Sequence, residues 1–347
     1  MAINSLSTLG YTVIAKWNFD IRVDRRRSLA DNVLVNLDVE TVLVDAASPQ
    51  SPATPQGTGD DTRLRGISRR RVLKALAGIG VAGAVTGLYS ITVEPFWPEF
   101  HGIELPIRNL PRAFDGYRIT HLTDTHAGDA TPLSYLNRVI DRVNEGRPDL
   151  VLFTGDLTTH DMDYVDPGCA LLKRLQAPVI ASLGNHDYDT DCACVGIGTR
   201  MAEKISTTLA SFGGRVLRNA STYIQRDGQT LYIAGCEDLM TGLLDVDRAL
   251  ADVPAGAACI MLSHNPDSVP QVDHPRVNLV LSGHTHGGQV RIPGLGAPLL
   301  PIRLRQYDAG LFSLRHTQLY VSRGVGCLRR IRLFCRPEIP TFVLRAA

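Results

Sequence analysis

Five short apolar runs in this sequence share one feature: each is followed at once by residues that can bind a metal ion. The runs and the residues after them are 118–123 before Asp124-Thr125-His126, 150–154 before Gly155-Asp156, 179–183 before Gly184-Asn185-His186-Asp187, 259–263 before His264, and 277–282 before Gly283-His284-Thr285-His286. Apolar runs of this length, bounded by glycine and polar residues, are typical of buried β-strands. Ligands in open α/β sheets bind beyond the carboxyl ends of the strands, so five parallel strands would bring these side chains to one rim.

The side chains expected at that rim are carboxylates, imidazoles and one amide. Divalent transition metals accept such mixed oxygen and nitrogen ligands, and the absence of thiolates argues against a structural zinc site. Two cations held about 3.5–4 Å apart by such a set are typical of enzymes that hydrolyse phosphate esters. The glycines before Asp156, Asn185 and His284 predict tight turns with positive φ at three of the strand ends.

The chain from Ile103 onward alternates predicted strands with predicted helices and then becomes rich in strands. Periodicity predicts helices at 133–143, 171–175, 202–212 and 243–250, a hairpin at 223–234 that turns at Asp227-Gly228, and strands at 289–292, 310–314, 318–321 and 341–344. This pattern indicates an α/β protein in which helices cover sheets. No linker interrupts it, so we expect one catalytic domain over residues 96–347.

Composition adds two constraints. Hydrophobic residues make up 44% of the 347 residues, enough for a large core, and the formal net charge of +1 gives no indication of a nucleic-acid partner. The seven cysteines resemble no disulfide framework, and Cys236 and Cys259 lie in apolar runs that predict core positions. Cys192 and Cys194 are expected in a surface loop, with a disulfide or an accessory metal contact as the alternative.

The segment before the catalytic domain contains an export-like signal. Ser68-Arg69-Arg70-Arg71-Val72-Leu73-Lys74 resembles the twin-arginine signature, with Val72 at the position that usually holds phenylalanine. The uncharged stretch 75–93 follows, and its length approaches the ~20 residues that a membrane-spanning helix needs. Basic residues on its N-terminal side predict a cytoplasmic amino terminus and an extracytoplasmic catalytic domain. We expect 68–95 to be an anchor, with cleavage near Ala82-Gly83-Ala84 as the alternative.

Residues 1–67 do not suit a signal that normally begins near its basic region. The stretch 33–44 alternates as a strand does, and 48–61 has the polar, proline-rich composition of a disordered linker. We therefore interpret 1–67 as a disordered or mis-started extension, with the true start between about residues 43 and 67.

Taken in order, the metal-binding motifs resemble those of the calcineurin-like metallophosphoesterase superfamily. The resemblance covers about residues 103–345 and rests on Asp-x-His, Gly-Asp, Gly-Asn-His-Asp, His and Gly-His-x-His, each at the end of an apolar run. Further stretches, such as 262–267, 282–289, 321–326 and 335–339, are similar to the bacterial membrane-associated YaeI/YkuE-type branch. The resemblance implies a four-layer sandwich of two mixed β-sheets flanked by helices.

The resemblance also implies a role for each residue. Asp124, His126 and His286 would bind one metal, Asn185, His264 and His284 would bind the other, and Asp156 would bridge them. A metal-bridging hydroxide would attack phosphorus, His186 would act as the general acid, and Asp187 would orient His186. The cofactors would be two divalent ions of Mn, Fe, Zn or Co, which this ligand set does not distinguish.

The expected function is therefore a membrane-associated phosphodiesterase or pyrophosphatase. Its substrate could be lipid-linked, of the UDP-2,3-diacylglucosamine type, and the alternative enzyme is a general envelope phosphodiesterase that acts on phospholipid or polymer. A non-catalytic, metal-dependent binding protein is the alternative of another class, and His186 argues against it. The roles of two further residues are undecided by the sequence: His160 could contact the substrate, and Arg323 could contact phosphate or cap a strand.

Overall fold

The computed structural model describes residues 5–7, 11–23, 33–45, 69–159, 161–188 and 200–346. The chain divides into two compact units, Met1–Ala75 and Leu76–Ala347. The first unit holds an antiparallel sheet of β1 (Ser5–Ser7), β2 (Tyr11–Val23) and β3 (Val33–Asp45). Strand β3 coincides with the strand that alternation predicts at 33–44, whereas the expected linker at 48–61 lies outside the described residues.

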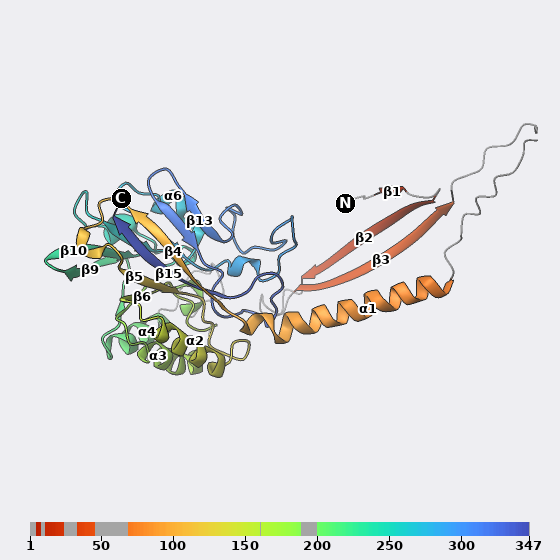
Figure 1. The fold of residues 1–347 in the computed structure, drawn as a ribbon, viewed down its shortest axis with the longest axis horizontal. Coiled ribbons are helices and arrows are strands. Elements are labelled where there is room, and N and C mark those ends of the chain that lie inside the picture. The colour runs from red at the N-terminus through yellow and green to blue at the C-terminus, as the bar shows by residue number, and fades with distance from the viewer. Residues whose placement is uncertain are drawn as a thin grey trace, which may run out of the picture. The chain divides into compact units, whose positions relative to one another are not determined.

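Two six-stranded mixed sheets form the centre of the second unit (Figure 1). The first sheet has the order β4 (Glu99–Ile107), β15 (Glu338–Ala346), β5 (Arg118–Leu122), β6 (Leu150–Phe153), β7 (Val179–Ala181) and β8 (Arg215–Val216). The second has the order β13 (Gly310–Ser313), β14 (Gln318–Val321), β12 (Leu279–Ser282), β11 (Cys259–Leu262), β10 (Gln229–Gly235) and β9 (Ala220–Arg226). All five strands predicted to carry metal ligands are present.

Helices cover the outer face of each sheet. Alongside the first sheet lie α2 (Leu133–Glu145), α3 (Val165–Lys173) and α4 (Arg200–Ala210), and the second sheet has α5 (Val246–Ala249) and α6 (Val269–Val272). The molecule is thus a four-layer sandwich with two mixed sheets, which confirms the expected fold class. The hairpin of β9 and β10 turns at Asp227 and Gly228, both with positive φ, as the Asp-Gly pair predicts.

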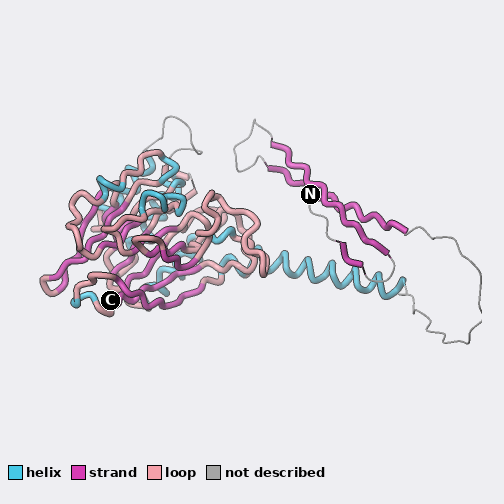
Figure 2. The backbone as a smooth tube through the Cα atoms, turned by 90° about the horizontal axis from the view of Figure 1, so that it is seen from above, coloured by secondary structure: helices cyan, strands magenta, loops and turns pink. Residues whose placement is uncertain are grey.

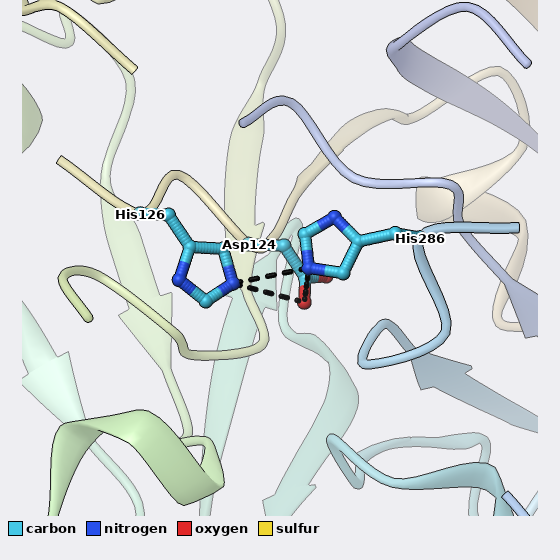
Figure 3. A group of neighbouring side chains, drawn as sticks. All are labelled: Asp124, His126 and His286. Atoms are coloured by element: carbon cyan, nitrogen blue, oxygen red, sulfur yellow. Dashed lines mark hydrogen bonds and ion pairs between the residues drawn. The ribbon is translucent and has the colours of Figure 1, made fainter. Parts of the chain in front are cut away.

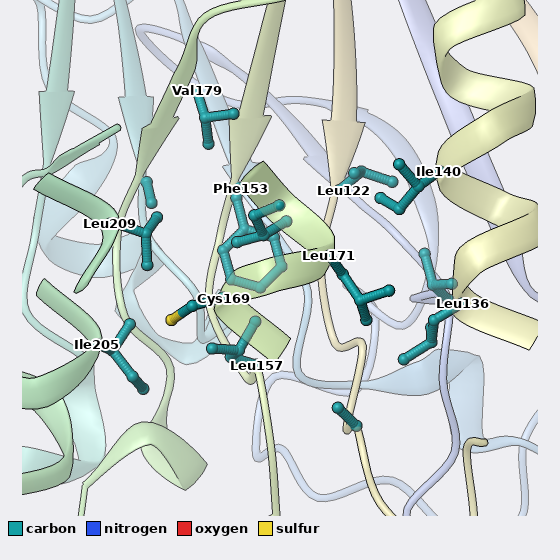
Figure 4. Close-up of a cluster of buried hydrophobic side chains, with 14 of the residues drawn as sticks. Leu122, Leu136, Ile140, Phe153, Leu157, Cys169, Leu171, Val179, Ile205 and Leu209 are labelled. Carbon is teal, nitrogen blue, oxygen red and sulfur yellow. The ribbon is translucent and has the colours of Figure 1, made fainter. Parts of the chain in front are cut away.

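Successive side chains of the central strands point to opposite faces of each sheet, so these strands contribute to more than one of the three hydrophobic cores. In β6, Leu150 and Leu152 point between the two sheets, whereas Val151 and Phe153 join the core beneath α2 and α3. Successive side chains of a strand face opposite sides, so a strand buried on both faces reads as a continuous apolar run. Figure 4 shows the outer core, in which Phe153 lies among Leu157, Cys169 and Leu171.

The expectation that five parallel strands share a single rim is wrong in one respect. Strands β5, β6 and β7 belong to the first sheet, whereas β11 and β12 belong to the second. The metal-binding residues therefore come from the ends of two facing sheets. Which strands pair depends on contacts far apart in sequence, and the local pattern carries no information about that choice.

The strand predicted at 289–292 is also wrong. Its residues alternate in polarity, but Val290 and Ile292 form only isolated bridges, with Leu333 and Gly296. The φ of +80° at Gly288 and +58° at Gln289 turns the chain away from the sheet. Tight turns of this kind prevent the extended pairing that a strand needs, so residues 289–309 form an irregular loop.

Helix α1 (Arg69–Thr92) precedes the sandwich, and the 3₁₀ turn Glu94–Phe96 follows it. Residues Leu76–Phe96 form a 21-residue stretch long and apolar enough to cross a membrane, and its side chains are largely exposed. The helix end is held by the catalytic fold, because the backbone N–H of Arg332 donates to the Ser90 carbonyl at 2.8 Å.

The packing of Phe153 gives a stability prediction. Its side chain is 1% exposed, so Phe153→Ala leaves a cavity beneath α3, and we expect the free energy of unfolding to fall by about 3–5 kcal/mol. Chemical denaturation monitored by circular dichroism measures this change. The matched control is Leu243→Ala, at a position 44% exposed, where we expect a change within about 0.5 kcal/mol. Equal effects of the two substitutions would contradict the assigned core.

Candidate metal centre

The ligand-bearing turns of the two sheets are tied together by backbone hydrogen bonds. Within the first sheet, the N–H of Asp124 donates to the Gly155 carbonyl at 2.9 Å, and within the second the N–H of Gly283 donates to the His264 carbonyl at 2.9 Å. Across the sheets, the N–H of His284 donates to Asp124 Oδ1 at 3.0 Å. The positions of the side chains relative to one another are therefore fixed by the main chain.

One group of potential ligands consists of Asp124, His126 and His286, all buried, from the turn after β5 and the turn after β12 (Figure 3). The Nε2 atoms of His126 and His286 lie 3.0 Å apart, and Asp124 Oδ1 lies 3.3 Å from His286 Nε2. Two imidazole nitrogens and a carboxylate oxygen thus converge on one point, an arrangement that suits a divalent cation.

A second group consists of Asp156, His264 and His284, which are also buried. The carboxylate Oδ2 of Asp156 lies 3.1 Å from His264 Nε2. Asn185 joins this group, because its Oδ1 lies 2.8 Å from His284 Nδ1. Sequence analysis singled out seven ligands, and the structure brings all seven to two adjacent groups.

The carboxylate of Asp156 lies between the two groups. Its Oδ2 is 3.4 Å from His126 Nε2 in the first group and 3.1 Å from His264 Nε2 in the second. A single oxygen that reaches imidazoles of both groups has the geometry of a bridging ligand.

Hydrogen bonds at the far side of two imidazoles orient them for metal binding. The Nδ1 of His126 lies 2.7 Å from the Thr159 hydroxyl, and the Nδ1 of His264 lies 2.7 Å from the Thr154 carbonyl. Since the Thr154 carbonyl can only accept, Nδ1 of His264 donates to it, which turns Nε2 toward the carboxylate of Asp156. Sequence reasoning did not identify Thr154 or Thr159 as supporting residues, although both flank the Gly-Asp motif.

Electrostatics also favours a cation at this position. Burial, and then the neighbouring Asp156 carboxylate, raises the pKa of Asp124 to about 7. Burial lowers the pKa of His284 to about 3 and that of His286 well below its usual range, so both imidazoles are neutral at pH 7 and retain a lone pair. The residues therefore fit divalent cations, which offset the repulsion between the two buried carboxylates.

The backbone at the site is strained where the ligands are attached. Five of the seven ligand residues have positive φ, which non-glycine residues rarely adopt: Asp124 (53°), His126 (42°), Asp156 (56°), His284 (66°) and His286 (50°). Such conformations cost of order 1–3 kcal/mol each and concentrate at functional sites.

The expectation of positive φ at the preceding glycines holds for Gly155 but is wrong for Gly184 and Gly283. These two glycines are required for another reason. A Cβ on Gly184 would overlap the carboxylate of Asp156. A Cβ on Gly283 would overlap both the carboxylate of Asp124 and the side chain of Thr123. Close approach of the backbone to the ligands, rather than a left-handed conformation, explains these glycines.

His186 and Asp187 lie in the 3₁₀ turn Asn185–Asp187, which follows β7. The His186 side chain is partly exposed, and its ring centroid lies 5.0 Å from that of His126. The carboxylate of Asp187 is buried and accepts hydrogen bonds from the backbone N–H groups of Asp156, Leu157 and Gly184, at 2.8–2.9 Å. These contacts hold the Asp156 turn in place, and the expected orienting of His186 by Asp187 stays a prediction.

Two arginines near the site have structural partners. Arg323 pairs with Glu338 and Glu99 at 2.7 and 2.6 Å, which favours the strand-cap interpretation over a phosphate contact. Arg332 is fully buried and donates to the carbonyls of Arg323, Gly326 and Cys335, while its Nη2 lies 3.4 Å from His286 Nδ1. Arg332 lies in a basic run, and nothing in the sequence separates it from its exposed neighbours.

The remaining residues singled out in the sequence either lie in the core or fall outside the described part of the chain. Cys236 and Cys259 are buried and free, as their apolar runs predict. His160, Cys192 and Cys194 lie outside the described residues.

Comparison with known proteins agrees with this geometry. The calcineurin-like phosphoesterase family matches residues 117–288. The metallophosphoesterase YkuE of Bacillus subtilis is 34% identical over 293 residues, which cover 82% of this chain and 99% of YkuE. The chain belongs to the calcineurin-like metallophosphoesterases. The two groups of ligands in this metallophosphoesterase correspond to the dinuclear metal centre of the family.

Two further relatives are enzymes by name. Phosphodiesterase YaeI of Escherichia coli is 35% identical over 281 residues, covering 79% of this chain and 97% of YaeI. The UDP-2,3-diacylglucosamine pyrophosphatase LpxG of Chlamydia trachomatis is 27% identical over 286 residues, covering 67% of this chain and 85% of LpxG. The metallophosphoesterase described here is accordingly a hydrolase of phosphoric ester or anhydride bonds, in the branch of YkuE and YaeI.

The position of Asp156 between the two groups predicts how metal binding fails. Asp156→Asn keeps the shape of the side chain but removes the negative charge shared by both groups. We expect the metal content, measured by inductively coupled plasma mass spectrometry after dialysis, to fall from two ions per chain to one or fewer. The control is Asp163→Asn on the exposed surface, which should retain two. Two ions in both variants would contradict a bridging position.

Proposed function

We propose that this chain is a phosphodiesterase or pyrophosphatase that uses two divalent cations and is tethered to a membrane. The observation that supports it most strongly is the position of Asp156 Oδ2, within 3.4 Å of His126 Nε2 and 3.1 Å of His264 Nε2. One carboxylate shared by two imidazole-containing groups is the arrangement needed to hold two cations close together.

Each ligand then has a defined task. Asp124, His126 and His286 would hold one cation, Asn185, His264 and His284 would hold the other, and Asp156 would contact both. Cations bound there supply Lewis acidity, which activates water and stabilises the charge of the phosphoryl oxygens. The main-chain bonds among the turns keep these side chains at fixed separations, so that little reorganisation accompanies the reaction.

His186 serves as the general acid. Its partly exposed ring adjoins His126 at the open side of the site, where a leaving oxygen can approach it. A proton passes from the imidazolium of His186 to that oxygen as its bond to phosphorus breaks. Asp187 contributes by fixing the turn that carries His186 and the turn that carries Asp156.

The substrate we propose is a lipid-linked phosphodiester or pyrophosphate. The similarity to LpxG, named for UDP-2,3-diacylglucosamine, and the apolar helix Leu76–Phe96 both support it. An extracytoplasmic domain would meet few nucleotide-sugar substrates, which favours a phospholipid or an envelope polymer over a nucleotide-linked lipid. Hydrolysis of liposome-bound substrate, compared with that of soluble bis(4-nitrophenyl) phosphate, separates an enzyme for lipid-linked substrates from a general phosphodiesterase.

The domain organisation follows from the same proposal. Residues 1–67 are an extension, 68–95 a twin-arginine-like signal that remains as an anchor, and 96–347 the catalytic domain outside the cytoplasm. A twin-arginine route exports folded proteins, so that the metal centre would be assembled before export.

The role of His186 leads to a test with substrates of different leaving groups. His186→Ala should lower kcat by about 10²–10⁴-fold for an alkyl phosphodiester, because a poor leaving group needs the proton. For bis(4-nitrophenyl) phosphate the loss should be smaller, because nitrophenolate leaves without protonation. Metal content should stay at two ions per chain.

His316→Ala is the matched control, since His316 lies outside both ligand groups, and it should leave both activities unchanged. Equal losses on both substrates would contradict general-acid catalysis by His186. Full activity of the His186 variant on the alkyl substrate would also contradict that role, whereas no hydrolysis of any phosphodiester by the unmodified protein would favour a non-catalytic binding protein.

The twin-arginine-like signature predicts that replacing its arginine pair changes the cellular location of the protein. Replacing both arginines in Arg69→Lys/Arg70→Lys should keep the chain in the cytoplasm, because the twin-arginine route requires the pair. Protease treatment of spheroplasts measures this: the unmodified chain should be digested and the variant protected. Arg112→Lys, in the catalytic unit, is the control and should be digested. Digestion of the double variant would contradict export by this route.

A further inference from the structure

An apolar groove opens directly beside the metal centre. It has a volume of about 510 Å³, and its lining includes His286, one of the seven ligands, together with Leu299, Leu300, Leu328 and Ile331. A phosphate group bound at the metal centre would therefore have an apolar channel next to it. Apolar pockets with a few convergent polar groups are typical ligand sites.

The leucines at the mouth of the groove are unusually exposed. Leu299 is 79% exposed, Leu295 on the same loop is 82% exposed, and Leu328 is 38% exposed. Contiguous exposed apolar residues mark surfaces that bind an apolar partner. The loop packs closely on Gly288, because a Cβ at that position would overlap Ala297 and the Leu299 carbonyl.

The groove also borders the end of the candidate membrane helix. One of its walls, 328–331, continues into a segment that hydrogen-bonds to the last residues of that helix. The N–H of Arg332 donates to the Ser90 carbonyl at 2.8 Å, and the N–H of Cys335 donates to Glu94 Oε1 at 2.5 Å. Figures 1 and 2 show these irregular loops beside the end of α1 that enters the catalytic unit.

Charge around the groove complements an anionic lipid. From Gln289 to Arg336 the sequence holds nine arginines, no lysine and one acidic residue, Asp308. Four of these arginines have structural partners within the fold: Arg291, Arg323, Arg332 and Arg336. Arg305 and Arg329 line the groove itself. Basic residues near a bilayer attract acidic headgroups.

We infer that the groove binds the aliphatic chain of a membrane lipid while the phosphate of the same lipid lies at the metal centre. The inference rests on the proposed function and specifies its substrate class: a phosphodiester or pyrophosphate that carries a long alkyl or acyl chain. The chain enters from the bilayer that the helix Leu76–Phe96 spans. The exposed leucines lie at the level of the lipid tails, and the arginines meet the headgroups.

A series of alkyl 4-nitrophenyl phosphates, from methyl to octyl, tests this with the full chain in nanodiscs. The value of kcat/KM should rise at least about twofold with each methylene, because each buried CH₂ strengthens binding. In Leu299→Gln/Leu328→Gln the ratio of the octyl to the methyl value should fall at least tenfold. Leu311→Gln, at an exposed position of β13 outside the groove, is the matched control and should keep the ratio.

The outcomes separate the two proposals. No hydrolysis of any diester in the series would overturn the proposed function. Hydrolysis with a kcat/KM independent of chain length would overturn only the assignment of the groove. An octyl-to-methyl ratio of kcat/KM that is unchanged in the groove variant would do the same.

A second measurement does not depend on turnover. A dodecyl phosphate with a terminal diazirine should label residues 298–301 or 328–331 after irradiation, as located by mass spectrometry. Labelling confined to the helix 76–96, or to the separate cavity between Phe100 and Thr341, would overturn the inference. This result does not depend on whether the Leu299→Gln/Leu328→Gln and Leu311→Gln variants fold.

Discussion

The hydrogen bond from the backbone N–H of His284 to the carboxylate of Asp124 joins the two halves of the site. Asp124 follows β5 of one sheet and His284 follows β12 of the other, so this contact sets how the two sheet edges face each other. The glycines that flank it leave no alternative, because a side chain at Gly283 or Gly324 would overlap Asp124. The seven ligands converge because these close backbone approaches exclude other arrangements, and the strained φ values of five of them are the cost.

The apolar layers serve this arrangement. The core between the sheets and the two outer cores hold the strands whose ends carry two buried, mutually repelling acidic groups, Asp124 and Asp156. Cations reduce that repulsion when they bind, and the buried, neutral imidazoles of His284 and His286 are suited to receive them. The fold thus supplies rigidity, whereas charge compensation comes from the ions.

The sequence predicted the local features well and the long-range ones poorly. The strands before Asp124, Asp156 and His264 begin where their apolar runs begin, because a strand buried on both faces must be apolar throughout. The division of those strands between two sheets was not predictable, since pairing depends on residues distant in the chain. The positive φ values at Gly288 and Gln289 prevent the strand expected at 289–292. The burial of Arg332 beneath His286 depends on tertiary packing, which its basic sequence neighbours do not reveal.

The central claim is that two cations share the carboxylate of Asp156, and an anomalous difference map from crystals grown with Mn²⁺ tests it most directly. Two peaks about 3.5–4 Å apart are expected, one beside Asp124, His126 and His286 and the other beside Asn185, His264 and His284, with Asp156 in contact with both. A single peak, or peaks that Asp156 does not touch, would contradict the account.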